Sequence, residues 1–228
     1  MAAINEQWTV GLNIPAEPGM PLAEVCTPAL VIDLNAFERN IVTMRDQVSA
    51  FGVRHRAHAK THKSADIALR QIELGGAVGI CCQKVAEAEA LVSGGVEDVL
   101  VSNQVVDARK IDRLVRLAAR ARVLVCIDDP HNVNDLSDAA VRHKQSIECL
   151  VEIDVGAGRC GVPPGPRAVE LARAIEAAPG LSFAGLQAYH GSAQHIVEHQ
   201  ARKCAIDKAI VAAARTVSSL RDAGLDCL

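Results

Sequence analysis

Strand-like and helix-like segments alternate along most of this 228-residue chain, and this alternation is the feature that most constrains its fold. Short runs rich in β-branched and apolar residues are each followed by a segment with apolar residues three and four positions apart. Six such pairs joined by short links predict an α/β protein with a parallel sheet. The expected strands are 53–59, 78–82, 98–102, 123–127, 149–154 and 183–189. The expected helices are 34–51, 64–74, 84–93, 108–121, 132–143, 166–178 and 196–223.

Polar side chains on the later strands distinguish between the two common parallel architectures. The two-residue period of a strand places Glu152 with Asp154, and Gln187 with Tyr189, on the same face of their strands. Convergence of polar groups from several strands is typical of a (β/α)₈ barrel, whereas a doubly wound sheet concentrates its site at one switch point. No glycine-rich dinucleotide fingerprint follows the first strand. We therefore favour a barrel, of which about six βα units are present.

The expected domain organisation is an arm followed by an incomplete barrel. Residues 1–25 contain several prolines without periodicity and predict an amino-terminal arm, and residues 26–228 would form the barrel part. A short β-type run is expected at 27–33. A barrel needs two more strands, and residues 224–228 resemble a helix stop leading into a strand. An open six-stranded sheet is the alternative, but we favour the amino-terminal part of a longer protein.

Charge and composition exclude several classes of function. The net charge is −3, from 24 Lys and Arg against 27 Asp and Glu, and the basic residues cluster only around residues 53–63, so we expect no nucleic-acid or membrane partner. No apolar stretch is long enough to span a bilayer and the start lacks an export signal, which predicts a cytoplasmic protein. The eight cysteines show no Cys-x-x-Cys spacing and are expected to be free thiols.

The basic stretch at 53–64 is the strongest candidate for a functional site. As a strand it would carry Arg54, Arg56, His58 and Lys60 on one face, either as a solvated edge or as the wall of an anion-binding site. Lys60 falls at the carboxyl end, and neighbouring positive charge lowers the pKa of a lysine, which favours the free amine that a Schiff base requires. On these residues alone a phosphate-pairing lysine is equally compatible.

The segment Arg56-Ala-His-Ala-Lys60-Thr-His-Lys63 resembles the pyridoxal-phosphate lysine motif of the D-threonine aldolase and D-serine dehydratase family. Blocks at 79–84, 151–161 and 185–195 are similar to that family in order and spacing, so the resemblance covers about residues 10–228. It implies an alanine-racemase-like barrel, pyridoxal 5'-phosphate as cofactor, a small D-amino acid as substrate and a homodimer in the full-length protein. The leader Gly11-Leu-Asn-Ile-Pro and the Cys-Cys-Gln-Lys block look most like aldolases acting on D-threonine or 3-hydroxy-D-aspartate.

The resemblance also implies roles for individual residues. Lys60 would hold the cofactor as a Schiff base, and Arg159 would lie beside its phenolic oxygen; the alternative for Arg159 is a salt bridge to Asp154 or Glu152. Tyr189 would pack against the cofactor ring, unless it is a core tyrosine.

A second group of residues would act around the cofactor. By the resemblance His195 is a base near the substrate hydroxyl, the alternative being an exposed histidine at a helix start. His58 and Gln83 would support the cofactor from behind the residues that touch it. His195 and His199 have a metal-like spacing, but without a third ligand or the Glu of His-Glu-x-x-His they are not interpreted as a metal site.

The expected activity is retro-aldol cleavage of D-β-hydroxy-α-amino acids into glycine and an aldehyde or glyoxylate, assisted by manganese or magnesium. In the family the His-x-Asp metal ligands, a glycine-rich phosphate-binding segment and a carboxy-terminal β domain follow beyond the region matched here, so none of them is expected in this chain. The alternatives are a dehydratase acting on D-serine or 3-hydroxyaspartate, a non-catalytic protein that binds pyridoxal phosphate, and an inert fragment.

Overall fold

The computed structural model describes residues 8–227, and the chain divides into two compact units between Thr43 and Met44. The first unit contains the short 3-10 helix η1 (Leu22–Glu24), and helix α1 (Leu34–Ala50) spans the boundary. Residues 27–33 form no strand, contrary to the expectation, because no described segment pairs with them and a strand requires a hydrogen-bonded neighbour. The sequence predicts a boundary between the arm and the barrel domain after residue 25, and that boundary stays a prediction.

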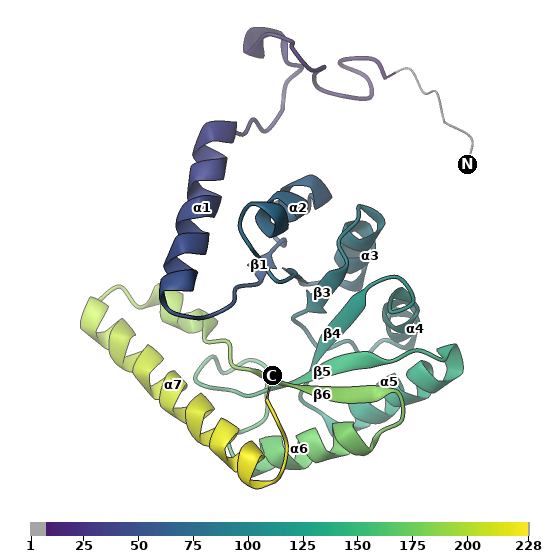
Figure 1. Ribbon diagram of the computed structural model, residues 1–228, viewed down its shortest axis with the longest axis vertical. Coiled ribbons are helices and arrows are strands. Elements are labelled where there is room, and N and C mark those ends of the chain that lie inside the picture. Colours follow the sequence, from purple (N-terminus) through teal and green to yellow (C-terminus); the bar gives the residue numbers. More distant parts are fainter. Residues whose placement is uncertain (1–7, 228) are drawn as a thin grey trace. The chain divides into compact units, whose positions relative to one another are not determined.

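Six parallel strands form the sheet of the second unit, in the same order as in the sequence (Figure 1). This sequential order confirms barrel-type winding, since a doubly wound sheet reverses its strand order at a switch point. The strands are β1 (Ala57–His58), β2 (Ile80–Cys82), β3 (Asp98–Val101), β4 (Arg122–Ile127), β5 (Ile147–Glu152) and β6 (Leu181–Gln187).

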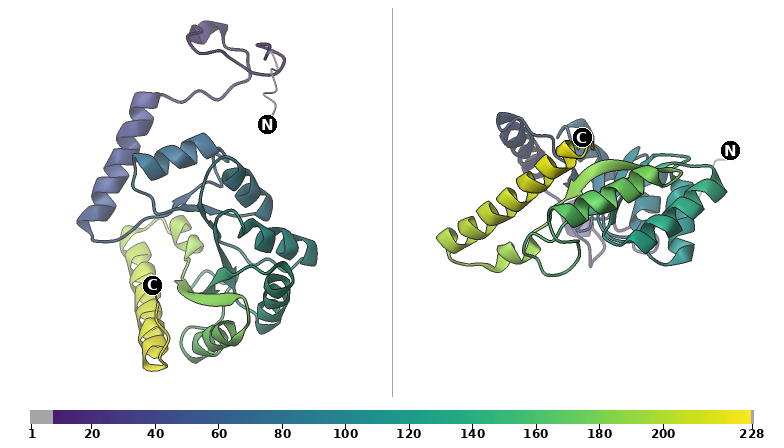
Figure 2. Two further views of the ribbon diagram at one scale, coloured as in Figure 1. Left: turned by 45° about the vertical axis from the view of Figure 1, so that its right-hand side comes forward. Right: turned by 90° about the horizontal axis from the view of Figure 1, so that it is seen from below.

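A helix follows each strand, as the alternation predicts, and the helices lie along the outer side of the curved sheet (Figure 2). Side chains cap several of them: Ser64, Asp107, Asp129 and Glu198 each accept a backbone N–H of the first turn that follows. The helices are α2 (Ala65–Glu73), α3 (Val85–Ser93), α4 (Ala108–Leu117), α5 (Pro130–His143), α6 (Pro166–Ala177) and α7 (His199–Asp222), with the 3-10 helix η2 (Gly191–His195) before α7.

The first strand is shorter than the predicted 53–59. β1 is an edge strand in the described sheet and pairs only with β2, so its ladder begins where β2 begins, at the pair Ala57 and Ile80. Before that point a single bond joins the segments, from Val78 N to His55 O at 3.0 Å. Lys60 therefore lies in the turn after β1 and not at the end of a strand.

The two faces of the sheet carry separate apolar clusters. The larger cluster packs between the sheet and the helices and contains alternate strand residues such as Val99, Val125 and Ile127. The intervening residues form a smaller cluster on the inner face, made of Cys81, Leu100, Leu124, Cys126 and Ala184 with Leu150 against it. All eight cysteines are free, as predicted, and four of them are buried.

Charged residues at the amino ends of the strands form a chain of ion pairs. Arg56 Nη1 lies 2.5 Å from Asp98 Oδ1, and Arg122 contacts the other oxygen of Asp98 at 3.1 Å and Glu148 at 2.5 Å. The partly buried Arg56 thus has the anion that its burial requires. The Arg56–Asp98 pair crosses directly over Gly79, where a Cβ would collide with the guanidinium and lie 2.7 Å from the carboxyl carbon of Asp98.

We expect Gly79→Ala to destabilise the fold by about 1–3 kcal/mol, because overpacking forces the ion pair or the backbone of β2 to move. Urea unfolding of the variant and the parent protein measures the change. The matched control places the same alanine in a background with Arg56→Ala and Asp98→Ala, where the methyl group has space. An equal loss of stability in both backgrounds would contradict this explanation.

Candidate functional site

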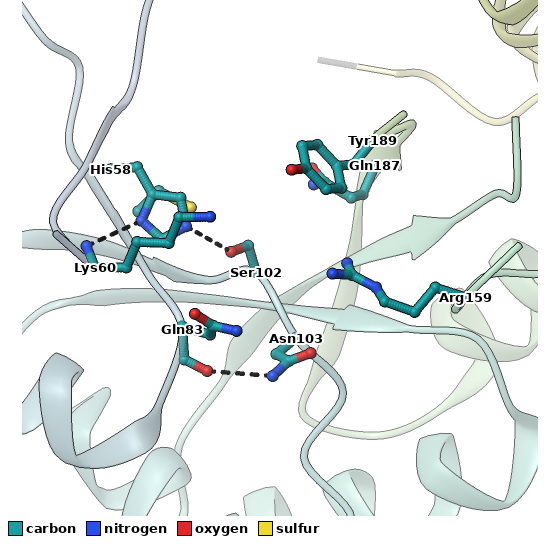
Figure 3. A pocket seen from close by; sticks show the side chains of 9 residues that line it. His58, Lys60, Gln83, Ser102, Asn103, Arg159, Gln187 and Tyr189 are labelled. Atoms are coloured by element: carbon teal, nitrogen blue, oxygen red, sulfur yellow. Dashed lines mark hydrogen bonds between the residues drawn. The ribbon is translucent and has the colours of Figure 1, made fainter. Parts of the chain in front are cut away.

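A cleft opens at the carboxyl ends of the strands, and five of the six predicted site residues line it (Figure 3). Its volume is about 80 Å³, below the roughly 300 Å³ at which small-molecule pockets begin, so the described residues form one part of an open site. The lining residues are His58, Lys60, Cys81, Gln83, Ser102, Asn103, Arg159, Gln187 and Tyr189.

Lys60 lies on a tight turn between β1 and α2. The turn closes with a hydrogen bond from Lys63 N to Ala59 O at 2.8 Å, and Lys60 N donates to Nδ1 of His58 at 3.2 Å. Nε2 of His58 lies 3.5 Å from the hydroxyl oxygen of Ser102, which follows β3. Burial, and then the positive charge of Lys60, lower the pKa of His58, so the ring is neutral at pH 7 and its Nδ1 can accept the backbone N–H.

The row of four cations predicted on this segment is divided between two places. Arg56 is held by Asp98 at the amino ends of the strands, whereas His58 and Lys60 face the cleft at the carboxyl ends. Because Asp98 neutralises Arg56, the charge of Arg56 does not act on Lys60 in the way that the sequence predicted.

The opposite wall of the cleft carries a cation stacked on an aromatic ring. The guanidinium carbon of Arg159 lies 5.4 Å from the centre of the Tyr189 ring, within the range of a cation–π contact. Arg159 Nη2 also lies 3.9 Å from Oε1 of Glu152, so the salt bridge weighed for this residue is present but long. Because the side chain of Arg159 is 53% exposed, its guanidinium can still bind another anion.

Glu152 is buried behind Arg159 and accepts a 2.7 Å hydrogen bond from Nε2 of Gln104. Burial raises the pKa of Glu152, while the bond from Gln104 and the charge of Arg159 lower it. These two partners supply the hydrogen bond and the opposite charge that a buried carboxylate needs.

The loop that carries Arg159 is organised by Asp154. Its Oδ1 accepts the N–H of Gly156 at 2.9 Å and that of Gly158 at 3.1 Å. Asp154 is thus used by the backbone, and the salt bridge to Asp154 that was the alternative for Arg159 is not present among the described residues. At Gly161 the chain returns with a φ of +105°, and a Cβ there would lie 2.6 Å from Asp154 N. Close backbone approach therefore requires the glycine at 161, whereas Gly156 and Gly158 adopt positive φ values that favour glycine.

The remaining predicted residues occupy different positions. Gln83 lines the cleft, and its carbonyl accepts a 3.4 Å bond from Nδ2 of Asn103. His195 lies exposed on η2 and is not among the described residues that line the cleft. Its neighbour Gln194 does reach the site, because its Nε2 donates to the hydroxyl of Tyr189 at 2.9 Å.

Four lining residues were not among the predicted site residues: Cys81, Ser102, Asn103 and Gln187, of which only Gln187 had been placed on the same strand face as Tyr189. Ser102 and Asn103 directly follow β3, so their place after a buried strand was the available signal. Cys81 gave no such signal in the sequence, since it lies within an apolar run.

Among residues 8–227 no group of three or more His, Cys, Asp or Glu side chains is arranged to hold a metal ion. No helix in the described part of the chain has the length and apolar character needed to cross a membrane.

The sequential parallel sheet and the lysine-bearing cleft at its carboxyl edge define a protein of the βα-barrel class. The family model for the alanine racemase N-terminal domain matches residues 32–228, so the chain belongs to that family.

Several proteins in the comparison are similar along nearly the whole chain. A 3-hydroxy-D-aspartate aldolase of Paracoccus denitrificans (strain Pd 1222) is 51% identical over 96% of this chain and 57% of its own length. A D-threonine aldolase of Arthrobacter sp. is 45% identical over 96% of this chain and 57% of its own length. The crystal structure of D-threonine aldolase from Filomicrobium marinum superposes with a TM-score of 0.90 at 50% identity, over 94% of this chain and 58% of that one. The chain thus spans under three fifths of the length of these relatives.

The Asp154 carboxylate should make a pH-dependent contribution to stability. Backbone N–H bonds, that of Gly156 foremost, lower its pKa below the ordinary 3.8, so ionised Asp154 favours the folded state. Its contribution is complete above the ordinary pKa and is lost as the pH falls through the lowered value. We expect the free-energy difference between the parent protein and Asp154→Asn to shrink from pH 6 towards pH 3 in urea titrations.

Asp138→Asn, on the exposed side of α5, is the matched control for this titration. A stability difference at Asp154 that stays constant with pH would show that its charge does not hold the loop.

Proposed function

We propose that the protein is a pyridoxal-phosphate-dependent carbon–carbon lyase that cleaves D-β-hydroxy-α-amino acids into glycine and an aldehyde, or glyoxylate from a hydroxyaspartate. The observation that carries the proposal is the position of Lys60, on a turn at the carboxyl end of β1, facing a cleft whose far wall is the Arg159–Tyr189 pair. The names of the two aldolase relatives support the reaction type.

The chemistry of the lining residues fits this cofactor. The cleft offers a primary amine for an aldehyde, an available guanidinium for a phenolic oxygen and an aromatic ring for a flat ring. Its three side-chain amides match polar groups of a substrate. Lys60 would bind the aldehyde carbon, Arg159 the phenolic oxygen and Tyr189 one face of the ring. When bound, the cofactor supplies an electron sink for the bond that breaks next to the amino group.

The chain's own residues would perform the remaining tasks. Neutral His58 holds the backbone of Lys60, so that its amine stays directed into the cleft. Gln83 would orient the substrate from the β2 side. His195 is proposed to take the proton of the β-hydroxyl, which requires η2 to bring its ring towards the cleft.

Three further features belong to the same proposal. A divalent metal, manganese or magnesium, would assist removal of the hydroxyl proton, with ligands from outside the described residues. The complete protein would be a homodimer, and it would act in the cytoplasm.

The test of Lys60 is spectroscopic. Purified protein with pyridoxal phosphate should show a visible absorption band that borohydride removes, and Lys60→Ala should lack it because no amine remains to form the Schiff base. Lys63→Ala is the matched control, three residues along the same turn. A band that persists in Lys60→Ala and disappears in Lys63→Ala would move the attachment site to Lys63.

The products distinguish the proposed reaction from its alternatives. With D-threonine or 3-hydroxy-D-aspartate as substrate, an aldolase releases glycine, whereas a dehydratase releases ammonia and a keto acid. We expect glycine, and added manganese should increase its release only in a protein that also carries the metal ligands from outside the described residues. Ammonia without glycine would show a dehydratase, and a reducible band with neither product would support a non-catalytic cofactor-binding protein.

A further inference from the structure

A second histidine, His62, is half-buried beside the Lys60 turn and does not line the cleft. Its Nδ1 accepts the backbone N–H of Ser64 at 3.1 Å. An imidazole nitrogen that accepts a hydrogen bond carries no proton, so the proton of the neutral ring is on Nε2.

The Nε2 side of His62 faces helix α2. The Gln71 side chain of that helix lies near the ring, and Oε1 of Gln71 and Nε2 of His62 are both buried with no hydrogen-bond partner among the described residues. A small movement of either side chain would close an Nε2–H···Oε1 bond and satisfy both atoms. Burial lowers the pKa of His62, which keeps the ring in the neutral form that this arrangement needs.

The turn requires such support from outside its own backbone. Lys63 has a φ of +54°, a left-handed conformation that is unfavourable for a residue with a Cβ. Ser64, the next residue, must be in place to cap α2, because its hydroxyl accepts the N–H of Ile67. The bond from Ser64 N to His62 fixes the point where the strained turn joins the helix.

The two histidines on either side of Lys60 make the same contact. His58 accepts the N–H of Lys60, and His62 accepts that of Ser64, each two residues further along the chain. His62 does not line the cleft, so it acts through the backbone and not on a bound molecule.

We propose that His62 is a positioning residue, whose neutral ring bridges Ser64 N and Gln71 so as to hold the Lys60 turn against α2. We call this bridge from Ser64 N through His62 to Gln71 the clamp. Its effect on Schiff-base formation rests on the proposed function, whereas its effect on the turn does not.

Asparagine and glutamine separate the two bonds of the ring. The oxygen of His62→Asn can occupy the place of Nδ1 and accept from Ser64 N, whereas His62→Gln places its polar group near Nε2 and leaves Ser64 N without an acceptor. Gln71→Leu removes the partner on the helix side. His131→Asn, at an exposed histidine of α5, is the matched control.

Two measurements follow the clamp without an activity assay. Amide hydrogen exchange of Ser64 reports the backbone bond, and the rate at which borohydride fixes pyridoxal phosphate to Lys60 reports the position of the amine. In His62→Gln we expect Ser64 to exchange roughly tenfold faster, as for the loss of one hydrogen bond, and the fixation to slow. His62→Asn should stay close to the parent protein, and Gln71→Leu should fall between them.

The outcomes are distinct. Equal effects of asparagine and glutamine would overturn the proposal, because only the volume of the ring would then matter. Unchanged Ser64 exchange in His62→Gln would overturn it as well. Faster Ser64 exchange only in His62→Gln, in a protein whose parent form fixes no pyridoxal phosphate, would support the clamp and refute the proposed function.

Discussion

The parallel, sequential register of the six strands is the constraint on which the rest of this structure depends. Because every strand runs in the same direction, residues that follow different strands, far apart in the sequence, meet at one edge of the sheet. Lys60, Ser102 and Gln187 reach the same cleft for this reason alone. The opposite edge collects the residues at the starts of the strands, and there Arg56 and Arg122 supply the positive charges that the partly buried Asp98 needs.

The sequence predicted the strands and helices well because their patterns are local. The strand-like runs predicted at 123–127 and 149–154 are visible within six residues and correspond, with shifted bounds, to β4 (Arg122–Ile127) and β5 (Ile147–Glu152). The length of β1 could not be found in this way, since it is set by the place where β2 begins, some twenty residues later. The partner of Arg56 was hidden for the same reason: Asp98 is 42 positions away and becomes a neighbour only when β1, β2 and β3 are aligned.

The candidate site shows the same division between local and distant information. The resemblance identified Lys60, Arg159 and Tyr189 as residues of one site, and the structure brings all three to the cleft. It could not indicate that Asp154 would be used by the backbone of the Arg159 loop, because that role depends on the left-handed turns at Gly156 and Gly158.

Both walls of the cleft are held by side-chain acceptors that bind backbone N–H groups, and these acceptors respond differently to acid. His58 and His62 hold the Lys60 turn as neutral rings, and protonation of Nδ1 removes the acceptor. Because the pKa of each ring is lowered in the folded protein, its contribution to stability is complete above the ordinary pKa of 6.5. That contribution is lost as the pH falls through the lowered pKa. Asp154 holds the Arg159 loop and loses its charge only below 3.8. The Lys60 turn therefore depends on neutral imidazoles and the Arg159 loop on an ionised carboxylate, so acid weakens both walls of the cleft by protonating these acceptors.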